Sequence, residues 1–221
     1  MPYNTARATL GAMWVNQSVA DAKTREVCLI ALDAVGKLCW ANGMVQFSQL
    51  LPANLLNTSQ LGCVCYEAPV AFALMANALS IHEANIFYNL ATGQNGNAQA
   101  VQHMYTRLGA NIARWQTGDA AIPAGAMVFH GDAGTPCRHV TFSIGNGDVV
   151  SCWGPGQAQP AIGGAAGLQS DAYKIYLKQV DDLIAKRMPP DTVVVPATAF
   201  TDLNNPAVRI HYTNGPFWTF W

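Results

Sequence analysis

The sequence predicts a single α+β domain that spans residues 1–221. Three features lead to this prediction: helical periodicity in the first half of the chain, two-residue alternation after it, and a further helix with short strands near the end. No internal repeat and no linker-like stretch divides the chain. A length of 221 residues is also sufficient for one substantial hydrophobic core.

Four segments have the spacing of apolar residues that predicts helices. Ser18–Trp40 is predicted as a core helix capped by its first residue, and Tyr66–Leu79 is apolar on nearly every side, which is typical of a helix in the middle of a domain. Ala98–Gln116 has one apolar stripe and is predicted to pack on the core from outside. Ser170–Arg187 is predicted as an amphipathic helix, and Gly154–Gly167 before it as a loop.

Short segments bounded by turn residues predict antiparallel strands, and one of them, Arg138–Ile144, alternates between polar and apolar residues. These segments are Ala126–Phe129, Arg138–Ile144, Asp148–Trp153, Thr192–Val195, Ala207–Thr213 and Pro216–Trp221. Asn-Gly pairs at residues 146–147 and 214–215 predict hairpin turns. A two-residue turn at 146–147 would set Thr141 opposite Cys152, whereas a three-residue loop would set Thr141 opposite Ser151.

The composition excludes two classes of protein. Hydrophobic residues make up 51% of the chain and charged residues 11%, against about 25% charged residues in average proteins, so intrinsic disorder is excluded. The net charge is -1, and the longest basic run is the pair Lys186–Arg187. We therefore expect no nucleic-acid partner, because nothing would attract a polyanion.

The N-terminal segment Met1–Asn16 lacks the charged and then apolar regions of a secretory signal peptide. No window reaches the roughly 18 uninterrupted apolar residues that a membrane span needs. We expect a protein without a membrane span that is made in the cytoplasm without a Sec signal. Six cysteines in 221 residues are too few for a disulfide scaffold, and Cys28 and Cys39 are predicted as buried reduced thiols.

Cys65 and His139 are the candidates for a nucleophile and its base. Cys65 precedes the apolar helix Tyr66–Leu79, and His139 lies 74 residues later on a predicted strand, on a polar face that we expect to border a cleft. The start of a helix stabilises a thiolate through the helix dipole and exposed N–H groups, and an imidazole can take the thiol proton and return it to a leaving group. Cysteine before histidine, with a helix before a hairpin, is the papain-type order.

Two blocks of sequence resemble the NlpC/P60 family of papain-like cysteine peptidases. Residues 122–130 (IPAGAMVFH) and 138–147 (RHVTFSIGNG) resemble the family signature PGD-LVFF … HVGIYLGNG, and residues 62–66 (GCVCY) are similar to the nucleophile segment. The resemblance implies a papain-like fold with a central nucleophile helix on an antiparallel sheet. The family-like core would cover about residues 50–153, with an extra N-terminal helix before it and a C-terminal elaboration, 154–221, of a helix plus strands.

The resemblance also implies an activity, which is hydrolysis of amide bonds in peptidoglycan stem peptides. The small size and the lack of a signal peptide or wall-binding repeat fit a bacterial effector or toxin. A dedicated secretion system would deliver such a protein to the periplasm of a target cell or into a host cell. The expected partners are a peptidoglycan peptide or protein substrate and an immunity protein or secretion chaperone, and no cofactor or metal is expected.

The identity of the nucleophile rests on Pro69. Proline is tolerated in the first turn of a helix but costs about 3 kcal/mol in its interior. Pro69 falls at the edge of the first turn if Cys65 is the cap, and nearly two turns in if the helix begins at Cys63. This favours Cys65, although Val64-Cys-Tyr-Glu67 departs from the Asp-Cys-Ser-Gly usual in the family, and Cys63 or two plain core thiols remain alternatives.

The third catalytic residue is assigned from the resemblance, which places the group that orients the imidazole twelve residues after the histidine. That position is Ser151, where relatives carry His, Asn, Gln or an acid. A backbone carbonyl or Asp148 could orient the ring instead. The backbone N–H of Cys65 and the side chain of Gln60 are candidate oxyanion donors.

Three other functions remain open. The same Cys-His chemistry serves a deamidase, a transglutaminase or a protease that acts on a host protein. A zinc-structured module could use four soft ligands, although their one-residue gaps are unlike usual zinc spacing; these ligands would be Cys63, Cys65, Cys137 and His139. An inactive family member could serve as an interaction protein. The remaining histidines (82, 103, 130 and 211) are predicted to be structural or on the surface, and the aromatic residues at 218, 220 and 221 to complete the core.

Overall fold

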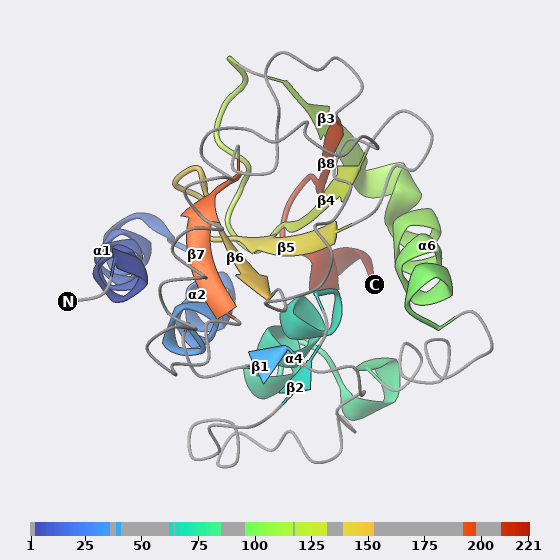
Figure 1. Cartoon of the computed structure of the whole chain (residues 1–221), viewed down its shortest axis with the longest axis horizontal. Coiled ribbons are helices and arrows are strands. Elements are labelled where there is room, and N and C mark those ends of the chain that lie inside the picture. The colour runs from blue at the N-terminus through green and yellow to red at the C-terminus, as the bar shows by residue number, and fades with distance from the viewer. Residues whose placement is uncertain are drawn as a thin grey trace.

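The computed structural model describes residues 3–35, 39–40, 62–63, 65–84, 96–116, 118–131, 139–152, 192–197 and 209–221. In this part of the chain, helices pack against an antiparallel β-sheet (Figure 1), which confirms the α+β class. Among these residues, no helix has the length and apolar character needed to cross a membrane. The predicted loop 154–167 and the predicted helix 170–187 lie outside the described residues.

The main sheet has six strands in the order β3-β8-β4-β5-β6-β7, and every neighbouring pair is antiparallel. The strands are β3 (Ile112–Trp115), β4 (Met127–Gly131), β5 (His139–Ser143), β6 (Asp148–Cys152), β7 (Thr192–Pro196) and β8 (Arg209–Thr213). The last strand of the chain, β8, lies between β3 and β4 (Figure 1). A separate parallel pair joins β1 (Cys39–Trp40) to β2 (Gly62–Cys63).

The longer helices are α1 (Tyr3–Ser18), α2 (Ala22–Asp33), α4 (Glu67–Met75) and α6 (Gly96–Leu108), and two 3-10 turns are η2 (Gly109–Asn111) and η4 (Phe217–Phe220). Helix α2 contacts both α1 and α4, and α4 contacts β5. Figure 1 shows α1 beside β7 at the left and α4 below β5. Helix α6 lies at the right of the view, on the side away from α1. These helices supply about half of the buried apolar residues of the hydrophobic core.

The two faces of the sheet differ in chemistry. Side chains alternate along a strand, so Val140 and Phe142 share one face, which we call the helix face. Phe142 meets Phe72 of α4 edge to face, with ring centroids 5.8 Å apart, and Val140 belongs to the same hydrophobic core. The opposite face, the polar face, carries side chains that are at most 1% exposed, namely His130, His139, Thr141, Ser143 and Ser151. The expectation that this face borders a cleft is therefore wrong, because all five residues are buried.

The predicted helix Ser18–Trp40 is wrong at both ends. Ser18 is the last residue of α1, and Asp21 caps α2 by accepting a hydrogen bond from the Thr24 N–H at 2.7 Å. Serine and aspartate are both good caps, and the sequence alone does not decide between them. Helix α2 then ends at Asp33, and Cys39 belongs to β1 rather than to a helix.

The other corrections concern where elements end. Helix α4 stops at Met75, before the predicted Leu79, and Asn77 follows with a φ of 51°. The predicted helix Ala98–Gln116 ends at Leu108, because the chain passes through η2 into β3, which pairs with β8. The C-terminal segment predicted as a strand forms the 3-10 turn η4. The β3–β8 pairing depends on residues about a hundred positions apart, so local periodicity could not reveal it.

The hairpin between β5 and β6 has a three-residue loop. Phe142 lies opposite Val150, and the Ile144 N–H donates to the Asp148 carbonyl at 3.1 Å. Continuing this register sets Thr141 opposite Ser151, so the three-residue alternative is the correct one.

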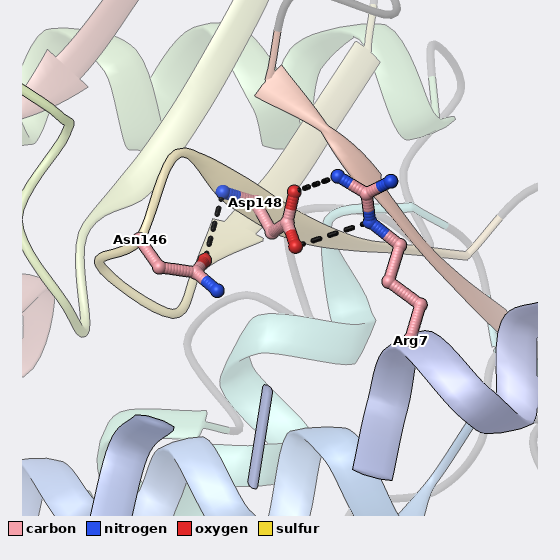
Figure 2. Close-up of polar contacts among 3 residues, drawn as sticks. All are labelled: Arg7, Asn146 and Asp148. Atoms are coloured by element: carbon pink, nitrogen blue, oxygen red, sulfur yellow. Dashed lines mark hydrogen bonds and ion pairs between the residues drawn. The ribbon is translucent and has the colours of Figure 1, made fainter. Parts of the chain in front are cut away.

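Polar contacts fix the start of β6. The Asn146 side chain accepts the Asp148 N–H at 3.0 Å, and Arg7 of α1 binds the carboxylate of Asp148 through two nitrogens, with the Nε donating at 3.1 Å (Figure 2). Asp148 is only 8% exposed. The ion pair therefore ties the N-terminal helix to the β5–β6 hairpin.

The hairpin loop offers a matched test of packing. Gly145 and Gly147 both have positive φ, at 94° and 88°, and only at Gly145 would a Cβ lie within 3 Å of another side chain. We expect Gly147→Ala to lower the free energy of unfolding by about 1 kcal/mol through backbone strain, and Gly145→Ala by about 2–4 kcal/mol, since a clash with Ala124 and Trp14 is added. Chemical denaturation of both variants measures the difference. Equal losses would mean that the loop moves away from α1 at little cost.

Candidate functional site

Cys65 lies in the turn that leads into α4. The N-cap is Tyr66, the first helical residue is Glu67, and Pro69 is the third. Pro69 is therefore in the first turn, where its missing N–H removes no interior hydrogen bond. The prediction that Cys65 caps this helix is wrong, since Tyr66 takes that position, and the choice of Cys65 over Cys63 stays a prediction. Cys63, by contrast, belongs to the short strand β2 and pairs with Trp40.

The two cysteines whose side chains are described differ in accessibility. Cys28 is completely buried in α2, and burial raises the pKa of its thiol to about 12, so it is an inert core thiol as predicted. Cys65 is also a thiol rather than half of a disulfide, and it is partly exposed. Of these two thiols, only that of Cys65 belongs to a residue with solvent exposure.

His139 contacts Ser151 on the neighbouring strand. The distance between His139 Nε2 and Ser151 Oγ is 2.8 Å, and both side chains are fully buried. The contact follows from the register of the hairpin, which brings the start of β5 against the end of β6. The predicted base and the predicted orienting residue are thus brought together, twelve residues apart in the chain.

A second imidazole stands beside the first. His130 of β4 is the cross-strand partner of His139, and the two rings stack with centroids 5.8 Å apart and planes 28° apart. His130 Nε2 lies 2.8 Å from Thr141 Oγ1. The prediction from sequence places His130 among the structural or surface histidines. The signal that was available is that the strand predicted at residues 126–129 continues in phase to residue 130, where it can pair with the start of β5.

Both imidazoles are neutral near neutral pH. Desolvation lowers the pKa of His130 to about 3. Desolvation also lowers the pKa of His139 well below 6.5, and the neighbouring His130 lowers it further. The burial that keeps His139 neutral also disfavours its protonated form, so its ring is a weaker base than that of an exposed histidine.

Cys65 and His139 lie towards opposite sides of the sheet. Cys65 packs against the hydrophobic core that includes Phe72 and Phe142, whereas the His139 side chain projects from the polar face. Each is at the start of its element, since Cys65 precedes the cap of α4 and His139 is the first residue of β5. The two side chains are therefore separated by the sheet, and only the ends of their elements lead toward each other.

The structure also places most of the secondary candidates. The alternative in which Asp148 orients His139 is wrong, because Arg7 binds its carboxylate and Asp148 lies three residues from Ser151, on the other face. Gln60 and Cys137 lie outside the described residues, and those residues hold no group of three potential metal ligands.

The C-terminal aromatic residues pack against the core as predicted. Trp218 stacks on Phe142 with ring centroids 6.4 Å apart, and Trp221 meets Phe217 edge to face at 6.1 Å. Of the other histidines, His82 is exposed, whereas His103 and His211 are partly buried. None of these residues joins the polar face.

The fold and the site define an α+β protein that has a buried pair of hydroxyl-bonded imidazoles on an antiparallel sheet and a partly exposed cysteine before a buried helix. No protein-family model, no curated protein and no solved structure matches this chain.

Proposed function

We propose that the protein is a papain-like cysteine hydrolase of the NlpC/P60 type that cleaves an amide bond, with Cys65 as nucleophile, His139 as base and Ser151 as the residue that orients the base. The observation that carries this proposal is the 2.8 Å contact between His139 Nε2 and Ser151 Oγ. It joins the two residues whose spacing led to the assignment. The partly exposed thiol at the start of α4 supplies a nucleophile of the expected kind.

The chemistry follows the acyl-enzyme route. The Cys65 thiol gives its proton to His139, and the sulfur attacks the carbonyl carbon of the substrate. The imidazolium then protonates the departing amine, which leaves a thioester on Cys65. Water, deprotonated by His139, attacks the thioester and releases the carboxylic acid together with the original thiol. Proton transfer would use Nδ1 of His139, since Nε2 contacts Ser151.

The site has one feature that opposes this route and one that suits it. Burial keeps His139 neutral and lowers its pKa, which opposes transfer of the thiol proton to its ring. Helix α4 begins without a side-chain cap at Tyr66, and the N–H groups of a first helical turn favour a negative charge on the residue that precedes it. The proposed substrate is a peptidoglycan stem peptide, and the proposed role is that of an effector or toxin delivered to a target cell.

The test is incubation of the purified protein with peptidoglycan sacculi and muropeptides, with products identified by mass spectrometry. The wild type and a Cys63→Ala variant are expected to release new stem-peptide fragments, whereas Cys65→Ala is expected to release none. Cys63→Ala is the matched control, because it removes the neighbouring thiol and the alternative nucleophile. Fragments from Cys65→Ala but not from Cys63→Ala would reverse the assignment.

A second measurement separates the chemistry from the substrate. Cys65 is expected to react with iodoacetamide faster than a thiol of the unfolded chain, and His139→Ala is expected to abolish that advantage. Rapid alkylation with intact muropeptides would contradict the peptidoglycan substrate and favour a deamidase, transglutaminase or protease that acts on a protein. Alkylation no faster than in the unfolded chain would contradict the hydrolase and leave an interaction protein.

A further inference from the structure

His130 and His139 form a cross-strand pair on the polar face. They are directly opposite each other in the β4–β5 ladder, and both are fully buried. Their rings are stacked rather than splayed, with centroids 5.8 Å apart. A ring in this position limits the space into which the His139 imidazole can turn.

Each imidazole of the pair is bonded to a hydroxyl group. His139 Nε2 contacts Ser151 Oγ and His130 Nε2 contacts Thr141 Oγ1, both at 2.8 Å. Thr141 comes two residues after His139 on the same strand face, and the hairpin register sets it opposite Ser151. Four polar side chains from three adjacent strands therefore form one buried block.

The block holds His139 from two sides. Ser151 approaches from β6 and bonds to one ring nitrogen, while His130 approaches from β4 and its ring stacks beside the His139 ring. His130 is itself kept in place by Thr141, and its partner on the far side, in β8, is Ile210. Hydrogen bonds between buried side chains favour one arrangement of the groups that make them.

We propose that His130 is a positioning residue for His139, which holds the His139 ring in the orientation that brings Nε2 to Ser151. The catalytic consequence of this orientation rests on the proposed hydrolase function, but the orientation itself does not. His130 acts through His139 and touches no substrate. The hydrogen bond between His130 and Thr141 is the interaction in this cluster that can be removed with the least change in side-chain volume.

Two variants and one control test whether His130 and its hydrogen bond orient the His139 ring. His130→Phe keeps an aromatic ring of similar size but loses the bond to Thr141, and Thr141→Val removes the hydroxyl with almost no change in volume. His211→Phe is the matched control, because His211 also lies on a neighbouring strand but faces α6, where its ring meets Tyr105 at 5.7 Å. Thr141→Val keeps the test available if His130→Phe fails to fold.

The decisive measurement is NMR of folded protein with nitrogen-15-labelled histidine. The wild type and His211→Phe are expected to show His139 in one tautomer, with the proton on a single ring nitrogen. His130→Phe and Thr141→Val are expected to show a mixture of tautomers or exchange broadening at His139. An unchanged His139 signal in both variants would overturn the proposal, and so would an equal change in His211→Phe.

Activity provides the second readout. With a substrate that the wild type cleaves, Thr141→Val is expected to lower kcat about tenfold to a hundredfold at unchanged KM, because only the orientation of the base is disturbed. A loss confined to KM would overturn the catalytic consequence. If the wild type cleaves nothing, the hydrolase proposal fails, and the NMR result still decides whether His130 positions His139.

Discussion

Replacement of Phe142 by alanine is expected to lower the free energy of unfolding by about 3–5 kcal/mol, the usual effect of removing a buried phenylalanine ring. Phe142 is completely buried at the centre of the helix face. It joins three elements, because its ring meets Phe72 of α4 at 5.8 Å and Trp218 of η4 at 6.4 Å. A cavity at this point would be enclosed by both helical elements and the sheet, which limits how far the surroundings can collapse.

Urea denaturation of the Phe142→Ala variant measures this loss. Phe220→Ala is the control, because Phe220 is partly buried in η4 near the chain terminus and packs against the same core. Its loss is expected to be less than half as large. Equal losses in the two variants would contradict the view that β5 and α4 meet through Phe142 at the centre of the core.

Acid is expected to destabilise the protein steeply below about pH 6.5. His130 has a folded-state pKa of about 3, and the pKa of His139 is also lowered well below 6.5, whereas both would titrate near 6.5 in the unfolded chain. Between these limits the unfolded state binds more protons, so stability falls as the pH falls. Each histidine contributes up to about 1.4 kcal/mol per pH unit, which over two pH units approaches the total stability of a typical domain.

The test is a series of urea denaturation curves from pH 7 to pH 4.5. His130→Phe removes one of the two buried titrating groups and is expected to reduce the slope of stability against pH by about half, whatever it does to stability at pH 7. His82→Phe is the control, because His82 is exposed, and it is expected to leave the slope unchanged. A slope that His130→Phe leaves as steep as in the wild type would show that the two imidazoles are not the cause.

The contact between His139 and Ser151 is the part of the candidate site that could be predicted, because it depends on a single hairpin. His139 and Ser151 are twelve residues apart, and a three-residue loop of positive-φ glycines around Asn146 brings them together. The sequence is compatible with two registers, and the backbone of the loop selects the one that sets Thr141 opposite Ser151. The sequence around the hairpin is therefore nearly sufficient to predict the His139–Ser151 contact, because the geometry of a hairpin depends on neighbouring residues.

The sequence indicates that His130 continues a strand, but not that its ring stacks on His139, nor how Cys65 lies relative to His139. The stack of His130 on His139 requires β4 to pair with β5 in one register, across a connection that the sequence does not define. Alternation along β5 separates polar from apolar side chains, but it does not say which face the helix covers. The structure places Phe142, not His139, against α4.

The fold shows the same division between local and distant causes. By itself, the sequence determined the α+β class, the buried nature of α4 with Pro69 in its first turn, and the strands β4, β5, β6 and most of β7, because each follows from the spacing of side chains over a few residues. Only the tertiary structure decided that β8 inserts between β3 and β4, that α6 gives way to β3, and that two imidazoles share the buried polar face. Those outcomes depend on hydrogen bonds and burial between segments far apart in the chain, and the free energy of such contacts overrides local preference.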